Sequence, residues 1–176
     1  MSGATADAGS VLVRPARPDD LPGLVAVHRQ PHYFAQRLAR QPGLGILLVA
    51  ECAGAVVGSA FLRLAPAEEW QLREWLPKVP VLSHVEVAPD YRGNGVGTAI
   101  IQAAEAEARA RQRHRIVLGV RPGDRAAYGR YERLGYVDWG RGRINALVVE
   151  YDDEGVRSVG TEPCLIMIKN LQTVSS

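Results

Sequence analysis

The sequence predicts a mixed α/β domain in which one strand–helix–strand unit lies between two β-hairpins. Apolar residues dominate 81–87 and 116–120, and an alanine-rich amphipathic segment lies between them at 97–112. A helix that joins two neighbouring strands makes them parallel, whereas a hairpin makes its strands antiparallel. We therefore expect a sheet with both kinds of pairing, in a single domain over 11–170.

The N-terminal part predicts a strand, two helices and the first hairpin. Small and polar residues at 1–10 are typical of a disordered tail. The elements expected after it are a strand at 11–14, a helix at 21–29 that begins after Asp19 and Asp20, a helix at 33–40 that ends before Pro42, and strands at 46–51 and 55–64 around a turn at Ala53-Gly54.

The segment 65–80 is less regular, because prolines at 66, 77 and 80 interrupt it. It predicts a short helix or an ordered loop. Acidic and aromatic side chains gather here, namely Glu68, Glu69, Trp70, Glu74 and Trp75. They are suited to line a site for a cation, and equally the two tryptophans could cover an edge of the core.

The C-terminal part predicts a helix at 124–134, a strand that begins at 136–139, and a second hairpin. Gly135 is expected to end the helix, because glycine readily adopts the left-handed conformation found there. The hairpin strands are expected at 144–151 and 164–168, separated by a turn-like segment that begins at Asp152.

The composition excludes several classes of protein. The chain has 176 residues, 47% of them hydrophobic, a net charge of +2, and no apolar run approaching the roughly 18 residues that span a bilayer. We therefore expect a cytoplasmic protein with no membrane and no nucleic-acid partner. Cys52 and Cys164 both lie within apolar runs, which favours reduced core thiols over a disulfide or a metal site.

The loop before the predicted helix at 97–112 contains Gly93, Gly95 and Gly97. Glycines leave backbone amides accessible, and the N-terminus of the helix adds a partial positive charge, so the loop is suited to hold a phosphate. A nucleoside triphosphate loop would need a lysine after its last glycine, and a dinucleotide loop would need Gly-x-Gly-x-x-Gly. Neither pattern occurs here.

The loop Arg92-Gly93-Asn94-Gly95-Val96-Gly97 resembles the acetyl-CoA loop of the Gcn5-related N-acetyltransferase (GNAT) superfamily, Arg/Gln-x-x-Gly-x-Gly/Ala. A second match follows the next strand, where Asp124, Ala127, Tyr131, Gly135 and Tyr136 occupy the positions of Asn-x-x-Ala-x-x-x-Tyr-x-x-x-Gly-Phe. The aspartate and the last tyrosine depart from that pattern. The resemblance implies a mostly antiparallel sheet of six to seven strands with about four helices and a splayed parallel pair that binds CoA.

The resemblance also implies how acetyl-CoA, the expected co-substrate, is held without a metal. Val85 and Val87 would contact the pantetheine arm through their backbone, and the Val87 amide would polarise the thioester. The pyrophosphate would lie on the amides of the loop, with Thr98 at the helix start. The cofactor-binding residues expected from the family are therefore Val85, Val87, Arg92, Gly93, Asn94, Gly95, Val96, Gly97, Thr98, Asp124 and Tyr131.

For catalysis, the resemblance assigns Tyr131 as the acid that protonates the departing thiolate, with Tyr128 as an alternative one turn earlier. The base is open. Strand alternation predicts that His84 and Glu86 share one face of 81–87 and that Ser83, with the valines at 81, 85 and 87, shares the other. Glu86 and Ser83 are the candidates, with His84 chemically suitable. Proton loss through water, with Glu68, Glu69 or Glu74 at the mouth of the site, is a further alternative.

The function expected is acetyl transfer to the primary amine of a small molecule, by direct attack in a ternary complex. Two alternatives remain: acetylation of a protein N-terminus or lysine, and a non-catalytic acyl-CoA-binding sensor. Proteins of this family are often dimers, so a homodimer is compatible with the resemblance.

Overall fold

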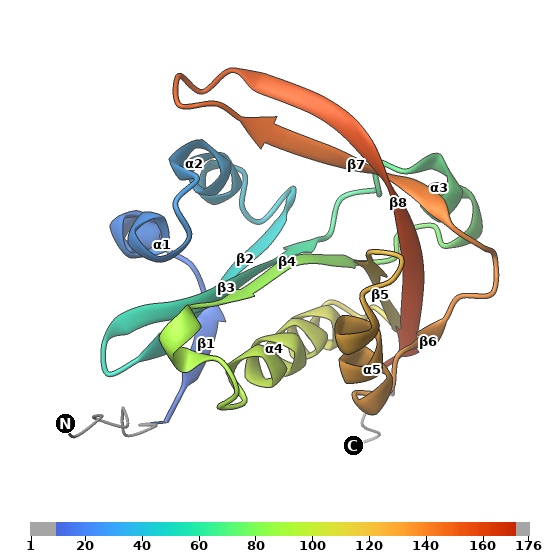
Figure 1. The fold of residues 1–176 in the computed structure, drawn as a ribbon, viewed down its shortest axis with the longest axis horizontal. Helices are drawn as coiled ribbons and strands as arrows, with labels where there is room; N and C mark the ends of the chain where they lie inside the picture. Colours follow the sequence, from blue (N-terminus) through green and yellow to red (C-terminus); the bar gives the residue numbers. More distant parts are fainter. Residues whose placement is uncertain (1–9, 172–176) are drawn as a thin grey trace.

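The computed structural model describes residues 10–171, in which the elements follow the order expected for the fold (Figure 1). The predicted tail at 1–10 lies, apart from Ser10, outside the described residues. The strands are β1 (Leu12–Pro15), β2 (Gly45–Cys52), β3 (Ala55–Arg63), β4 (Val81–Val87), β5 (Arg115–Val120), β6 (Val137–Asp138), β7 (Ile144–Tyr151) and β8 (Arg157–Asn170). The α-helices are α1 (Leu21–His28), α2 (Pro31–Ala39), α3 (Trp70–Trp75), α4 (Val96–Ala110) and α5 (Arg125–Arg133).

The sheet is mixed and mostly antiparallel, as predicted. The strand order is β1-β2-β3-β4-β5-β8-β6, and β7 pairs with β8. The β4–β5 pair is parallel because α4 joins these strands, and the other pairs in the described residues are antiparallel. The segment 65–80 contains the short helix α3, which was one of the two alternatives for it.

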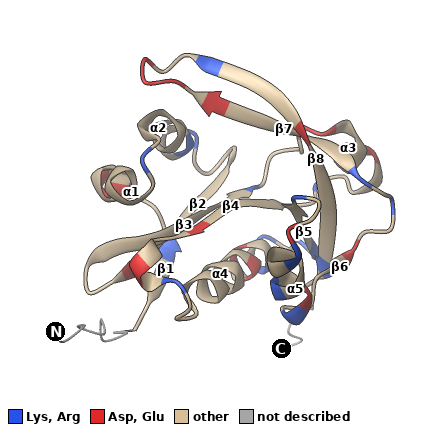
Figure 2. Cartoon of the chain, in the orientation of Figure 1, with Lys and Arg blue, Asp and Glu red and all other residues tan. Residues whose placement is uncertain are grey.

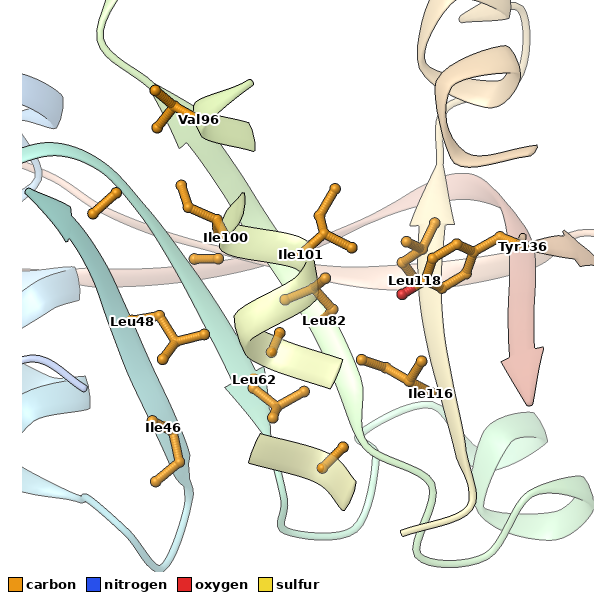
Figure 3. Close-up of a cluster of buried hydrophobic side chains, with 14 of the residues drawn as sticks. Ile46, Leu48, Leu62, Leu82, Val96, Ile100, Ile101, Ile116, Leu118 and Tyr136 are labelled. Atoms are coloured by element: carbon orange, nitrogen blue, oxygen red, sulfur yellow. The ribbon is translucent and has the colours of Figure 1, made fainter. Parts of the chain in front are cut away.

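The main core lies between α4 and one face of the sheet (Figure 3). Residues of α4 that recur every three to four positions, such as Ile100, Ala104 and Ala108, are fully buried against Leu48, Leu62 and other alternate residues of the strands, which lie on one face. This packing places the N-terminus of α4 beside the end of β4, where the glycine-rich loop joins the two elements.

The opposite face of the sheet is covered by α1 and α2 (Figure 1). Leu24 of α1 and Tyr33 and Phe34 of α2 pack against Leu47 and Phe61, which point away from α4. The β7–β8 hairpin extends over α2, where the Tyr151 hydroxyl donates to Oε1 of Gln36 at 2.9 Å. Helices α1 and α2 and the β7–β8 hairpin thus surround the space next to β4 on the face of the sheet that points away from α4.

Strand β8 has 14 residues and is much longer than the predicted 164–168. Its first half pairs with β7 and its second half with β5, while Met167 and Ile168 also pair with β6. Residues 157–163 lack the apolar alternation of a half-buried strand because this part of β8 is largely exposed. This half of β8 is a strand because it pairs with β7.

Candidate active site

The parallel strands β4 and β5 separate soon after they meet. Their register contains two pairs, Val81 with Val117 and Leu82 with Leu118. On its other side, β4 stays paired with β3 as far as Val87, which lies opposite Gly58. Past Leu82, β4 is therefore hydrogen-bonded along one edge and leaves a gap towards β5.

The backbone of Val87 points into this gap. The Ala88 amide donates to the Val57 carbonyl at 2.8 Å, so the neighbouring pair of Val87 and Gly58 does not exchange hydrogen bonds. In such a pair both backbone groups point away from the partner strand. The Val87 carbonyl accepts a hydrogen bond from Nε of Arg92 at 3.0 Å, which leaves the Val87 amide facing the gap.

A β-bulge at His84 changes the direction of the side chains along β4. One residue lies between Ser59 and Phe61 on β3, but two residues lie between their partners Glu86 and Ser83 on β4. His84 has a φ of 54°, which accommodates the extra residue. Beyond His84, the side chains of β4 therefore lie on the opposite faces from those that regular alternation predicts.

The predicted facing of the β4 side chains was therefore wrong. Val85 and Val87 pack against the main core together with Leu82, whereas Val81 packs against α3 and β8 on the other side. Glu86 also lies on that other side, where its Oε2 is 3.2 Å from Nδ1 of His28 in α1. The extra residue reverses the sides expected for Val85 and Glu86.

The glycine-rich loop has an open backbone. Gly93 and Gly95 both have a φ of 79°, and a Cβ built on either would meet no atom within 4 Å. The first hydrogen bond of α4 runs from the Ala99 amide to the Gly95 carbonyl, so within the described residues the amides of 93–98 have no backbone acceptor. Val96 is buried in the core and anchors the loop. The open amides fit an anion such as a pyrophosphate.

Helix α5 begins at a capping interaction made by Asp124. Its Oδ1 accepts from the Ala127 amide at 3.1 Å, which satisfies one of the free amides of the first turn. This use of the carboxylate gives the aspartate at the family's asparagine position a structural role. Whether it also contacts the cofactor remains a prediction.

Tyr131 lies half-buried on α5 against the main core, as does Tyr128. Its ring makes an edge contact with Tyr136, with the ring centroids 5.9 Å apart. Burial raises the pKa of the Tyr131 phenol above its ordinary value, so the group keeps its proton at neutral pH. A protonated phenol can serve as an acid.

Tyr136 is itself fixed by a buried carboxylate. Its hydroxyl donates to Oε1 of Glu105 at 3.0 Å, and Nζ of Lys169 lies 3.0 Å from the same oxygen. Glu105 is 3% exposed, and its charge is balanced by Lys169. This network holds the aromatic surface on which Tyr131 rests.

A cavity of about 370 Å³ lies next to the gap between β4 and β5. Ser83 and His84 of β4 line it, as do Gly119 of β5 and Cys164 of β8. The other walls come from α2, α3, β3, β7 and the segment before α3. Of the three candidates for the base, Ser83 and His84 border this cavity, whereas Glu86 borders a smaller one that it shares with His84.

The environment of His84 keeps its imidazole neutral. Burial lowers its pKa below 6.5, and the nearby Arg37 guanidinium lowers it further, although Glu86 opposes this. The pKa of Glu86 is also lowered, because its carboxylate accepts a hydrogen bond from His28. At neutral pH His84 is therefore a neutral imidazole and Glu86 is a carboxylate.

Charged residues of both signs line the larger cavity. Figure 2 shows the charged residues along the elements that form it. Arg63 lies 3.7 Å from Glu68, and Arg121 lies 3.5 Å from Glu162. Oε1 of Glu69 accepts from the Leu147 amide at 3.1 Å and so helps to join the segment before α3 to β7. The acidic residues near α3 thus make contacts within the protein.

Only part of the acidic and aromatic segment reaches the cavity. Glu68 and Glu69 line it, but Glu74 does not. Trp70 and Trp75 are 61% and 49% exposed and lie outside it, and the Arg141 guanidinium stacks on the Trp75 ring at 3.4 Å. An aromatic lining for a cation is therefore not formed by these tryptophans.

Sequence reasoning missed two features of the site. The pairing of His28 with Glu86 joins residues 58 positions apart through the packing of α1 on the sheet, and no local pattern indicates it. Arg37 of α2 also lines the cavity, although in the sequence it is one of several basic residues near the end of a helix.

Within residues 10–171, no cluster of three or more metal-ligating His, Cys, Asp or Glu side chains occurs. No helix in the same range is long and apolar enough to cross a membrane.

The acetyltransferase (GNAT) family model matches residues 13–136. The chain belongs to this family. Like other GNAT enzymes it is an acetyl-CoA-dependent N-acetyltransferase, and the open loop amides and the β4–β5 gap are the features of this structure that fit acetyl-CoA. The predicted family, fold class and co-substrate are confirmed.

Known GNAT proteins resemble this one in sequence and in fold. The L-methionine sulfoximine/L-methionine sulfone acetyltransferases of Pseudomonas aeruginosa and Pseudomonas paraeruginosa are each 30% identical over 144 residues, which cover 72% of this chain and 80% of theirs. The ribosomal-protein-alanine N-acetyltransferase of Brucella melitensis is 26% identical, with a TM-score of 0.66 and coverage of 91% and 99%. The acetyltransferase yncA of Salmonella typhimurium, solved with acetyl-CoA, shares the fold, with 21% identity, a TM-score of 0.61 and coverage of 96% and 98%.

Proposed function

We propose that this GNAT enzyme transfers the acetyl group of acetyl-CoA to the primary amine of a small molecule, by direct attack in a ternary complex. The observation that carries the proposal is the cavity of about 370 Å³ beside the β4–β5 gap. Its size is at the small end of ordinary ligand pockets. The relatives that act on methionine sulfoximine and methionine sulfone also support a small acceptor.

In the proposed complex, the pyrophosphate lies on the amides of 93–98, and the thioester carbonyl accepts a hydrogen bond from the Val87 amide. This hydrogen bond strengthens as negative charge develops on the carbonyl oxygen during attack. The amine nitrogen forms a bond to the carbonyl carbon, and the bond from that carbon to sulfur breaks. Tyr131 gives its proton to the departing thiolate, and the proton that the attacking nitrogen loses as the amide forms restores the phenol.

The acceptor must lose a proton before its nitrogen can attack. We assign this step to His84, which is neutral at pH 7. His84 borders the cavity of about 370 Å³, which we call the acceptor cavity. Glu86 lies behind His84, on a space of about 10 Å³ that would hold a single water molecule and that also borders His84. Ser83 orients the amine from the same strand.

The hairpin β7–β8 favours a small molecule over a peptide. Leu147 and Val149 of β7 line the cavity on the side away from the sheet. The hairpin is joined to the segment before α3 through Glu69 and to α2 through Tyr151. A peptide would need an open groove at this position.

The proposal is tested by measuring thiol release from acetyl-CoA with a panel of acceptors. The panel contains L-methionine sulfone, L-methionine sulfoximine, spermidine, an aminoglycoside and peptides with a free N-terminus. We expect acetylation of at least one small amine and no comparable rate with peptides. Preference for a peptide would establish the protein acetyltransferase alternative, and tight CoA binding without any transfer would establish the sensor.

A further inference from the structure

Arg37 differs from the other arginines of the acceptor cavity in that it has no acidic partner. Arg63 and Arg121 are each matched by a glutamate within 4 Å. Among residues 10–171, no carboxylate lies within that distance of Arg37. Its Nε is buried and has no hydrogen-bond partner. Among the described residues, Arg37 is therefore an arginine of the cavity with no carboxylate in direct contact.

Two aromatic rings hold Arg37 in place. The guanidinium carbon lies 3.8 Å from the centre of the Tyr33 ring and 5.1 Å from that of Phe61. Stacking of this kind uses the face of the guanidinium and leaves the N–H groups at its edge available. The rings belong to α2 and β3 and are almost fully buried, so the position of the cation is rigid.

We propose that Arg37 binds an anionic group of the acceptor, so that the substrates of this enzyme are small amines that also carry a carboxylate, as amino acids do. This inference rests on the proposed function, because it concerns the acceptor of the same reaction. A guanidinium offers two parallel N–H groups that match the two oxygens of a carboxylate. An unbalanced cation next to the reaction centre would repel a polyamine.

The position of Arg37 relative to His84 fits a short acceptor. The imidazole of His84 packs on the same Tyr33 ring, with the ring centroids 4.6 Å apart. Arg37 and the residue assigned to deprotonate the amine therefore contact the same ring, and both line the same cavity. In an α-amino acid the amine and the carboxylate are attached to the same carbon, so binding of the acid group would hold the amine beside β4.

The test compares Arg37→Gln with Arg40→Gln as the matched control. Arg40 lies at the exposed C-terminal end of the same helix and does not line the cavity. Each enzyme is assayed with L-methionine sulfone and with its carboxamide, which has nearly the same shape but no negative charge. Arg37→Lys is included because it keeps the charge and loses the paired geometry.

We expect Arg37→Gln to lower kcat/KM for L-methionine sulfone by about 10- to 100-fold, the range for a lost hydrogen bond to a charged group. The loss for the carboxamide should be much smaller, and Arg37→Lys should lie between wild type and Arg37→Gln. Arg40→Gln should behave as wild type with both. L-methionine sulfone should also raise the melting temperature of the CoA-bound wild type but not that of CoA-bound Arg37→Gln.

Equal losses for the acid and the amide would overturn the assignment, because they would indicate a structural role for Arg37. A wild-type enzyme that acetylates spermidine or an aminoglycoside, but no amine with a carboxylate, would also overturn it and leave the proposed function standing. Absence of transfer to every small amine in the panel would instead remove the proposed function.

Discussion

Replacing Gly95 by aspartate tests whether the glycine-rich loop is an anion site. Gly95 precedes the 15-residue helix α4, and a side chain there would project into open space. Asparagine at the same position is the control, because it has the same shape without the charge. Both residues tolerate a positive φ better than other side chains do.

The expected size of the effect follows from the charge alone. A carboxylate about 6 Å from a pyrophosphate that carries roughly two negative charges, at an effective dielectric constant of about 40, adds about 3 kcal/mol of repulsion. This corresponds to roughly a 100-fold weaker affinity for acetyl-CoA in Gly95→Asp than in Gly95→Asn. The strain at φ 79° costs each variant about 1 kcal/mol, or roughly 2–4 °C in melting temperature.

Calorimetric titration with acetyl-CoA measures the difference in affinity. Because the predicted effect is electrostatic, it should shrink in 1 M salt, where charges are screened beyond about 3 Å. Dissociation constants of the two variants within threefold of each other at low salt would refute the anion site, provided that both proteins melt at similar temperatures.

Three further predictions concern the acid, the base and the packing of the site. Tyr131→Phe should lower kcat at least 10-fold and leave the affinity for acetyl-CoA near that of wild type, because the hydroxyl acts on the thiolate and not on the bound cofactor. The kcat of the wild type should stay constant from pH 8 to 6.5 and fall only at lower pH, because burial holds the pKa of His84 below its ordinary value. His84→Gln should be slow at every pH. Glu105→Ala should destabilise the fold by about 3–5 kcal/mol, seen in urea denaturation, because it leaves a buried tyrosine hydroxyl and a lysine unpaired.

Other results would contradict these predictions in distinct ways. Unchanged turnover in Tyr131→Phe would direct attention to Tyr128 as the acid. A kcat of His84→Gln that equals the wild-type value would exclude the imidazole as the proton acceptor. A denaturation midpoint of Glu105→Ala equal to that of wild type would mean that the buried network adds nothing to stability.

Sequence reasoning located most elements of the fold. Residues 81–87 form β4 within the bounds predicted, and α4 begins one residue before the predicted start. These elements have local signals: an apolar strand, three glycines and an alanine-rich amphipathic pattern. Strand β8 was underestimated, because its exposed half is held only by pairing with β7.

Prediction of the site was less complete where it depended on side-chain direction. Alternation assigned Val85 and Glu86 to the wrong faces, because one extra residue at His84 reverses the pattern. A non-glycine residue with a positive φ has no signal of its own in the sequence. The capping role of Asp124 was likewise not expected, although aspartate is a common cap.

The sequence by itself determined what donates the acetyl group. The loop from Arg92 to Gly97 and the motif around Tyr131 are contiguous or nearly so, and their chemistry lies in backbone amides and in one phenol whose positions follow from local structure. The acceptor cavity is different, because its walls come from α2, α3, β3, β4, β5, β7 and β8. Only the tertiary structure decided that Arg37 would be left without an acidic partner there, since the charge balance of a cavity depends on which distant side chains packing brings together.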